Sequence, residues 1–508
     1  MKIHSGPILC ASVCCLFFPA IILAAGNNYQ GTDNLPHWQT PEFNNQWGLE
    51  AINAQYAYAR GYNGYGINIG VLDAKLFQHP EFNGKLSQLS GHLPYDFETE
   101  EDGSISFESH GVHVAGIAAA RQDGTGMHGV AFSATLTTGN IPDSNNVLEF
   151  MAQNNVRVIN NSWGEEPPVE EDADGNKLYL PNGTYKYIQV TPTSVTEELL
   201  PLRERIRAFS KAPVPSTVAD KDGDEQDIAG WAGMLRAARH GKLIVFAAGN
   251  ENNYNVPMHS ATLPYLFPDV LDRYLIVANL TPDDELHVTS TSCGHTASYC
   301  VSAPGTDIYS AAGNFISRTG GPITEAALNR GELTEEPDYR EETGTSMAAP
   351  HVTGAAAVLM QRFPYMTAEQ ISTVLKTTAS DLGAPGIDNR FGWGKINLKE
   401  AIDGPGMFIT AADIPPEHYV PGSYTNTQFV ANIPGVGGVL DAGTPLERQC
   451  SGPECALDIW RNDIGGHGGL TKEGAGVNAT MFDRYLPFSC PLNTFVTDAV
   501  RFAPFHHH

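Results

Sequence analysis

Short apolar runs alternate with helical patterns through most of this chain, and this alternation constrains the fold more than any other feature. The run Ile67–Leu72 is rich in β-branched residues and is followed by Asp73, which is typical of a buried strand. Similar runs end near Gly139, Asn160 and Ala248, with helical patterns at 110–120, 145–154 and 229–239. The alternation predicts an α/β fold that is doubly wound, with helices on both faces of a mostly parallel sheet.

The charge balance limits the partners of the chain. Its 508 residues carry a formal net charge of −27. Nucleic-acid binding needs clustered Lys and Arg to neutralise phosphates, so no nucleic-acid partner is expected. A strongly acidic balance suits a soluble protein that works outside the cell.

The N-terminal segment has the pattern of a secretory signal peptide. Lys2 precedes an apolar stretch from Ile8 to Leu23, and the small residues Ala24 and Ala25 suit a cleavage site. A membrane anchor is the alternative, but no second apolar span follows. We therefore expect a secreted mature chain with no stable membrane span, acting as a monomer.

The remaining sequence divides by composition. A polar segment at 26–45 precedes a domain at 46–404, which carries an acidic insertion at 165–228. Within this insertion, Asp220–Asp224 faintly resembles a calcium loop, although a solvated acidic loop fits its spacing better. A boundary at Gly404–Pro405 opens a small β-rich extension at 405–476, and a divergent tail with three terminal histidines follows at 477–508.

Five cysteines follow the signal segment, and four of them form close pairs. In an oxidising compartment, their spacing predicts the disulfides Cys293–Cys300 and Cys450–Cys455. Cys490 is left over.

A serine stands at a Gly-rich turn directly before a helical run of small and apolar residues. This serine, Ser346, lies in the run from Gly344 to His351. A turn exposes the hydroxyl, and the helix N-terminus directs free N–H groups toward it. A lone Gly-Thr-Ser is more often an ordinary helix cap, so a nucleophile needs a base nearby.

Three polar residues elsewhere in the chain are candidates for the base that Ser346 needs and for the groups that assist it. Each lies at a position where an α/β sheet is expected to expose its side chain. Asp73 ends a predicted strand, His110 begins a helix of small residues, and Asn250 follows another strand. His110 and His113 together could suggest zinc, but no glutamate follows in the metalloprotease arrangement, which favours a packed His113. Taken singly, Asp73 and Asn250 are also common turn residues.

In chain order these residues read Asp, His, Asn, Ser, and here the sequence resembles the subtilisin-like serine proteases. The matching motifs are Val71–Asp73, His110–Gly116, Val158–Gly164, Ala248–Asn250 and Gly344–His351. The resemblance covers residues 46–402 and implies a subtilisin-like fold. More narrowly, the chain is similar to the autotransporter branch of Gram-negative bacteria, through the Cys293–Cys300 loop and the segment Asn462–Lys472.

That branch implies export through the periplasm and release outside the cell. Residues 405–476 would then begin a passenger stem, and they could assist folding because 26–45 is too short for a folded prodomain. Beyond Val477 the sequence leaves the expected pattern, which we interpret as truncation or a shifted reading frame.

The resemblance implies a serine endopeptidase of broad specificity that acts on protein or peptide substrates. Asp73, His110 and Ser346 would be catalytic, with the Asn250 amide and the Ser346 N–H as the oxyanion hole. Ser162, Trp163 and Gly164 would bind an extended substrate strand, with Trp163 either crowding or lining the first pocket. The alternatives are an inactive binding or adhesin module with this fold, and an esterase that uses the same triad.

Catalysis of this kind needs no cofactor. Asp123 and Glu81 fall near the structural calcium positions of the family, and both residues suit a solvated turn equally well. Structural calcium is therefore an open expectation.

Overall fold

The computed structural model describes most of the region from Leu35 to Gly404 and four short strands beyond it. The described ranges are 35–73, 79–88, 97–99, 102–107, 109–140, 144–164, 169–181, 185–188, 200–211, 224–251, 259–364, 366–404, 406–409, 428–431, 440–441 and 501–502. The expected signal peptide, the Cys450–Cys455 pair, Cys490 and nearly all of the C-terminal tail lie outside them. Within these ranges, no helix combines the length and the apolar character that crossing a bilayer requires.

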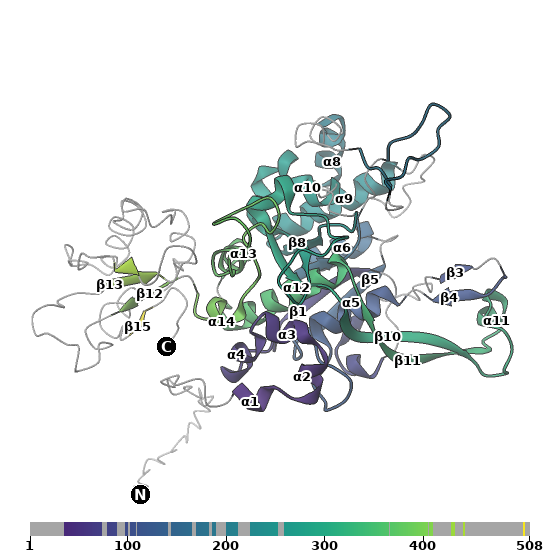
Figure 1. The fold of residues 1–508 in the computed structure, drawn as a ribbon, viewed down its shortest axis with the longest axis horizontal. Helices are drawn as coiled ribbons and strands as arrows, with labels where there is room; N and C mark the ends of the chain where they lie inside the picture. Colours follow the sequence, from purple (N-terminus) through teal and green to yellow (C-terminus); the bar gives the residue numbers. More distant parts are fainter. Residues whose placement is uncertain are drawn as a thin grey trace, which may run out of the picture.

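A seven-stranded parallel sheet forms the centre of the molecule (Figure 1). Its order is β2-β5-β1-β6-β7-β8-β9. The strands are β1 (Asn68–Asp73), β2 (Leu86–Gln88), β5 (Thr135–Asn140), β6 (Val156–Asn161), β7 (Leu243–Ala247), β8 (Tyr274–Leu280) and β9 (Cys300–Pro304). The predicted α/β class and its parallel sheet are confirmed.

Helices cover both faces of this sheet because its strands are apolar on both faces. In β7, Leu243 and Val245 join one apolar core, whereas Ile244 and Phe246 join the other. The first core contains α5 (His110–Ala119), α12 (Thr345–Arg362), α13 (Ala368–Thr377) and α14 (Leu398–Ala401). The second core contains α6 (Ser144–Gln153), α9 (Asp224–Arg239) and α10 (His259–Leu266).

The described N-terminal part of the chain forms a series of short helices. The polar segment before residue 46 contains α1 (Leu35–Trp38) and α2 (Pro41–Asn45), and Thr40 caps α2. Two further short helices follow, α3 (Trp47–Ala51) and α4 (Ala54–Ala59). Asn53 lies between them with φ of 60°, a left-handed conformation that ends a helix.

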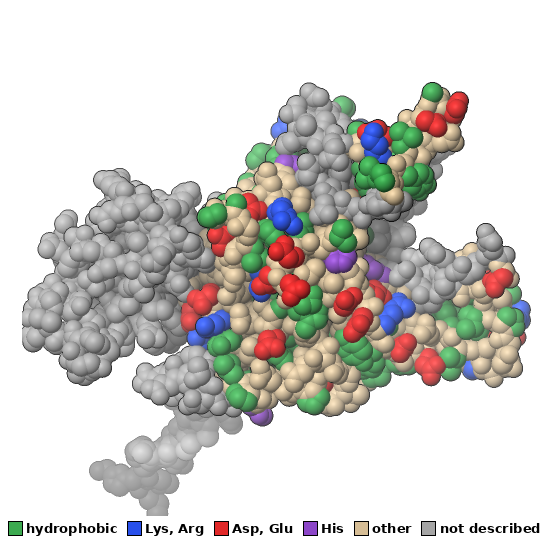
Figure 2. Space-filling view, in the orientation of Figure 1, with side chains coloured by type: hydrophobic (Ala, Val, Ile, Leu, Met, Phe, Trp, Pro, Cys, Tyr) green, Lys and Arg blue, Asp and Glu red, His purple; other side chains and the backbone are tan. Residues whose placement is uncertain are grey.

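A long antiparallel hairpin, absent from the sequence-based expectations, projects from the body (Figure 1). It consists of β10 (Ile308–Ser317) and β11 (Leu333–Glu342), with α11 (Glu325–Asn329) between them. The small hairpin of β3 (Phe97–Thr99) and β4 (Ile105–Phe107) joins it through a bond from Ile105 N to Ile323 O. Acidic side chains are prominent along the projecting arm (Figure 2). We call β10, α11 and β11 the arm.

The described part of the acidic insertion contains strand bridges and a helix. Bridges pair Val169 with Tyr187 and Tyr179 with Tyr185, and α8 (Arg203–Phe209) packs against α9. Helix α9 begins at Asp224, five residues before the predicted start at 229. The last residues of the range predicted for the insertion, 224–228, therefore belong to this helix. Most of Asp220–Asp224 lies outside the described residues.

The backbone beyond Gly404 contains strand pairing of its own. Four short strands, β12 (Gly406–Ile409), β13 (Gln428–Ala431), β14 (Leu440–Asp441) and β15 (Arg501–Phe502), form an antiparallel sheet in the order β14-β13-β12-β15. Strands β12, β13 and β14 lie within 405–476, whereas β15 lies beyond it, and a β-rich extension at 405–476 stays a prediction. The domain boundary at Gly404–Pro405 stays a prediction.

Candidate active site

Two of the expected site residues, Asp73 and Asn250, lie at or just beyond the carboxyl ends of parallel strands, whereas His110 and Ser346 lie in the first turns of helices. Asp73 is the last residue of β1, and Asn250 follows β7 after two residues of turn. Because β1, β6 and β7 are parallel, their carboxyl ends meet at one edge of the sheet. Helix α12, which carries Ser346, packs against β6, β7 and β8.

His110 and Asp73 form a hydrogen-bonded pair. His110 Nδ1 lies 2.8 Å from Asp73 Oδ1. Asp73 is 2% exposed, whereas the His110 side chain is 27% exposed. Since a carboxylate only accepts, the bond places the imidazole proton on Nδ1 and leaves Nε2 as the basic nitrogen. The exposed part of the pair therefore belongs mainly to His110.

Ser346 lies in the first turn of α12. Gly344 precedes the helix in an extended conformation, and its N–H donates to Gly305 O at 2.8 Å. The Ser346 side chain is almost buried, and its hydroxyl donates to the backbone carbonyl of Ser162 at 3.1 Å. At this position the helix contributes backbone N–H groups that have no intrahelical acceptor.

Thr345 orients Asn250, and the sequence reasoning did not identify this role. Asn250 Oδ1 accepts from Thr345 N at 2.8 Å and from Thr345 Oγ1 at 3.2 Å. The amide oxygen is thereby engaged, and Nδ2 remains the donor that Asn250 can offer to a substrate. The signal was present as the threonine beside Ser346, but its partner could not be named without the fold.

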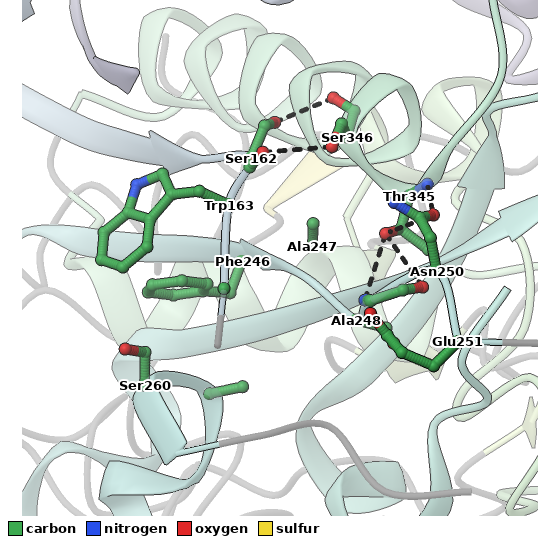
Figure 3. Close-up of a pocket in the computed structure, with 13 residues that line it drawn as sticks. Ser162, Trp163, Phe246, Ala247, Ala248, Asn250, Glu251, Ser260, Thr345 and Ser346 are labelled. Carbon is green, nitrogen blue, oxygen red and sulfur yellow. Dashed lines mark hydrogen bonds between the residues drawn. The ribbon is translucent and has the colours of Figure 1, made fainter. Parts of the chain in front are cut away.

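A cavity of about 220 Å³ adjoins Ser346 (Figure 3). Trp163 lines it, with its ring packed edge-on against Phe246 at 5.2 Å between centroids. Ser162, Gly164, Asn250 and Glu251 also line it. Trp163 and Phe246 therefore form an aromatic part of the lining of this cavity, and the role of Trp163 in the first substrate pocket stays a prediction.

His113 is a buried residue of the core, in agreement with the packed role expected for it. Its Nε2 lies 3.1 Å from the Arg340 carbonyl oxygen. Burial lowers the pKa of His113 to about 4, so the ring is neutral at physiological pH. His113 therefore links α5, which also bears His110, to strand β11 of the arm.

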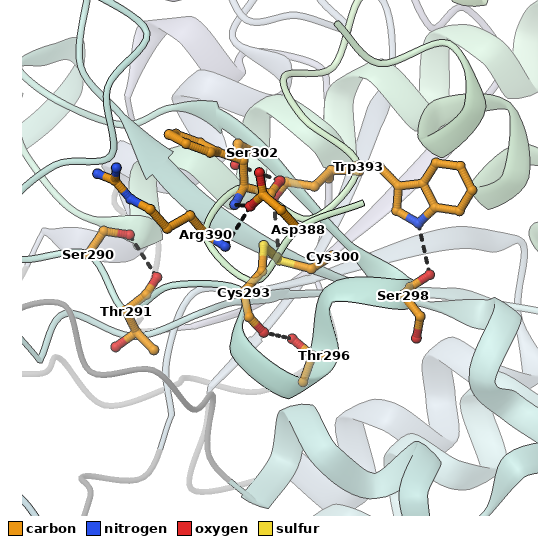
Figure 4. Close-up of a disulfide and its surroundings, with 12 residues drawn as sticks. Ser290, Thr291, Cys293, Thr296, Ser298, Cys300, Ser302, Asp388, Arg390 and Trp393 are labelled. Carbon is orange, nitrogen blue, oxygen red and sulfur yellow. Dashed lines mark hydrogen bonds between the residues drawn. A yellow bond between two sulfur atoms is a disulfide. The ribbon is translucent and has the colours of Figure 1, made fainter. Parts of the chain in front are cut away.

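The Cys293–Cys300 disulfide is formed (Figure 4). It closes a 3-10 turn at the start of β9, with a sequence separation of 7. Gly392 packs on it with φ of 64°, and a Cβ at this glycine would lie 2.2 Å from Cys300 O. The predicted Cys450–Cys455 disulfide lies outside the described residues.

The carboxylates expected near calcium are engaged by protein groups. Glu42 Oε1 accepts from the backbone N–H groups of Asp123 and Gly124, each at 2.8 Å. Glu81 Oε1 accepts from the Tyr339 hydroxyl at 2.7 Å, and Arg121 pairs with Asp123. In the described part of the chain, no group of three or more His, Cys, Asp or Glu side chains is arranged to hold a metal ion.

Comparison with known proteins places this geometry in a family. The model of the subtilase family matches residues 64–394. The chain is 55% identical over 446 residues to an extracellular serine protease of Serratia marcescens, which covers 87% of this chain and 42% of that protein. It is 25% identical to the Neisserial autotransporter lipoprotein NalP of Neisseria meningitidis, over 83% of this chain and 37% of that protein.

These matches leave more than half of each relative without a counterpart, because the chain spans 42% and 37% of their lengths. Among solved structures, fervidolysin from Fervidobacterium pennivorans, described as a keratinolytic enzyme related to subtilisin, matches with a TM-score of 0.45 and 21% identity, over 79% of this chain and 54% of that one. The family model covers more than half of the sequence, and its matched range contains the four residues at the sheet edge. The chain therefore belongs to the subtilase family.

Proposed function

We propose that this protein is a secreted serine endopeptidase that hydrolyses peptide bonds through an acyl-enzyme. The observation that carries the proposal is the hydrogen-bonded pair of His110 and Asp73 at the same sheet edge as Asn250 and the helix bearing Ser346. The family membership supports the same activity.

The mechanism follows from the hydrogen-bond pattern. His110 Nε2 takes the proton of the Ser346 hydroxyl as the oxygen attacks the substrate carbonyl, and it later gives this proton to the leaving amine. Asp73 holds the Nδ1–H tautomer and stabilises the imidazolium. Asn250 Nδ2 and the Ser346 backbone N–H bind the tetrahedral oxyanion.

The Ser346 hydroxyl changes partners during this step. It donates to the Ser162 carbonyl in the resting structure. A hydroxyl has one proton to donate, so that bond is exchanged for one to His110 before attack.

The substrate pairs as an extended strand beside Ser162, Trp163 and Gly164, which follow β6. Backbone pairing is common to all peptides and gives broad specificity. The aromatic wall of Trp163 and Phe246 lies beside the side chain that precedes the cleaved bond.

Casein hydrolysis tests the proposal. The wild-type protein should degrade casein, while Ser346→Ala and wild-type protein treated with a sulfonyl fluoride should not. Ester hydrolysis without casein hydrolysis would establish the esterase alternative, and inactivity of pure, folded wild-type protein on both would establish the binding-module alternative.

We further propose that the protein reaches the extracellular space through the periplasm of a Gram-negative bacterium and acts as a monomer. The extracellular relative from Serratia marcescens supports the location. Detection of activity in culture medium, and a single-chain mass by light scattering, test the two statements.

Structural calcium is retained as an expectation from the family, in spite of the protein contacts made by Glu81 and Asp123. If the ion binds, these carboxylates exchange their present partners for it, and the chelator EDTA lowers the melting temperature. An identical melting temperature with and without chelator would contradict the expectation of structural calcium.

A further inference from the structure

A proline inside α12 frees the backbone carbonyl of the nucleophile. In an α-helix the N–H of residue i+4 donates to the carbonyl of residue i. Position 350, four residues after Ser346, is Pro350, which has no N–H to donate. The Ser346 carbonyl therefore needs a donor from outside the helix.

Ser162 supplies this donor. Its hydroxyl donates to Ser346 O at 2.8 Å, and the Ser346 hydroxyl donates to Ser162 O at 3.1 Å. Figure 3 shows the two bonds side by side between the strand end and the helix. This reciprocal pair fastens the first turn of α12 to the segment that the substrate is proposed to pair with.

Two further buried residues fix the direction of the Ser162 hydroxyl. Asn160 Nδ2 donates to Ser162 Oγ at 2.9 Å, so this oxygen accepts from Asn160 and its own proton points to Ser346 O. Asn160 Oδ1 in turn accepts from Thr353 Oγ1 at 2.9 Å. Asn160 and Thr353 are both 0% exposed.

The chain of bonds begins and ends on the same helix. Thr353 lies seven residues after Ser346, which is about two helical turns and places both residues on one face of α12. The sequence Thr353, Asn160, Ser162, Ser346 thus runs through β6 and returns to the nucleophile. Each donor in it has one acceptor, so the direction of every bond is determined.

We propose that Asn160 and Thr353 are positioning residues for Ser346, which act through the Ser162 hydroxyl and the carbonyl that Pro350 leaves open. The inference rests on the proposed peptidase function. By holding the Ser346 backbone, the network fixes both the attacking hydroxyl and the N–H that faces the oxyanion. Small displacements of such groups reduce turnover strongly.

The test compares Thr353→Val, which removes only the hydroxyl, with Ser302→Ala as a matched control. Ser302 is buried and donates to Phe391 O at 3.1 Å, outside the network. Thr353→Val should lower kcat and the rate of sulfonylation of Ser346 by a common factor of about ten, with KM and the pH midpoint of kcat unchanged. Thr353→Ser, which keeps the hydroxyl, should restore both rates, and Ser302→Ala should keep both at the wild-type level.

A double-mutant cycle with Pro350→Ala tests the link through the carbonyl. Alanine supplies an N–H that competes with Ser162 for Ser346 O, so Thr353→Val should cost a smaller factor in this background. An equal factor in both backgrounds would overturn the link. Equal kcat for Thr353→Val and Ser302→Ala, with wild-type protein active, would overturn the positioning role, whereas inactive wild-type protein would instead refute the peptidase function.

Discussion

At the scale of single residues, the site depends on hydrogen bonds that fix the orientation of Asn250 and His110. Thr345 engages the Asn250 oxygen, and Asp73 engages His110 Nδ1. Both bonds leave one defined atom, Asn250 Nδ2 and His110 Nε2, for the reaction. Orientation of this kind is the main contribution of a protein to acyl transfer, because it is in place before charge develops.

Asn250→Ala should lower kcat by about 10²–10³ with little change in KM, since removal of an oxyanion donor has this effect in subtilisin itself. Peptide hydrolysis kinetics and thermal unfolding measure the two properties. Asn314→Ala, an exposed asparagine on the arm, is the matched control. Near-normal turnover of a folded Asn250→Ala protein would refute the oxyanion role.

Glu81 should make stability depend on pH. Burial, partly offset by the Tyr339 hydroxyl, raises its pKa from 4.5 to about 7. Between these values the folded state holds a proton that the unfolded state has lost, so the Glu81 contribution to the free energy of unfolding is present below pH 4.5 and is lost as pH rises to about 7. Buried His113, His128 and His351, with pKa values lowered to about 4, act in the opposite direction.

The isosteric variant Glu81→Gln isolates the contribution of Glu81 titration to the free energy of unfolding. In the presence of EDTA, the free energy of unfolding of wild type minus that of Glu81→Gln should decrease from pH 4.5 to 7 and then level off. Urea denaturation at several pH values measures it. A difference that is constant across this range would show that Glu81 titrates normally.

At the scale of elements, the arm and α12 form one continuous unit at the active site. Strand β11 ends at Glu342, two residues before the turn that opens α12. Ser310 Oγ of β10 donates to His113 O at 2.8 Å, and Arg340 of β11 contacts Ser109 beside His110. The arm therefore packs against the helix of the base and leads into the helix of the nucleophile.

The Cys293–Cys300 disulfide should stabilise the start of β9. Replacing both cysteines by serine should lower the free energy of unfolding by about 2–3 kcal/mol, the value expected for a loop of this length. Urea denaturation under oxidising conditions measures this loss. Dithiothreitol should destabilise the wild type more than the double variant, which still carries the predicted Cys450–Cys455 pair; equal effects of dithiothreitol on the two proteins would contradict the prediction.

At the scale of the whole molecule, two apolar cores lie on opposite faces of the central sheet. The described part between Leu35 and Gly404 contains both of them. A long parallel sheet, however, folds slowly because its contacts are distant in sequence. Assistance from another part of the chain is therefore expected to affect the rate of folding more than the final activity.

Deleting residues 405–476 should lower the yield of active enzyme, while kcat per titrated active site stays unchanged. Active-site titration with a sulfonyl fluoride after refolding separates the two quantities. The same segment added as a separate polypeptide should restore the yield. An undiminished yield after deletion would refute a folding role for this segment.

The sequence by itself determined the α/β class, the strand that ends at Asp73 and the chain order of the four site residues, because these features are local or lie in fixed motifs. It did not predict the arm, whose charged strand Leu333–Glu342 lacks the apolar alternation that marks a strand. Its strand form depends on pairing with β10.

Only the tertiary structure decided how the polar side chains around Ser346 are connected. The sequence separates Asn160 from Thr353 by 193 positions, and no local pattern joins them. Pro350 is visible in the sequence, but the donor that replaces its missing N–H lies on another element. Hydrogen bonds between distant segments depend on how strand and helix are packed, and this packing is a property of the folded chain.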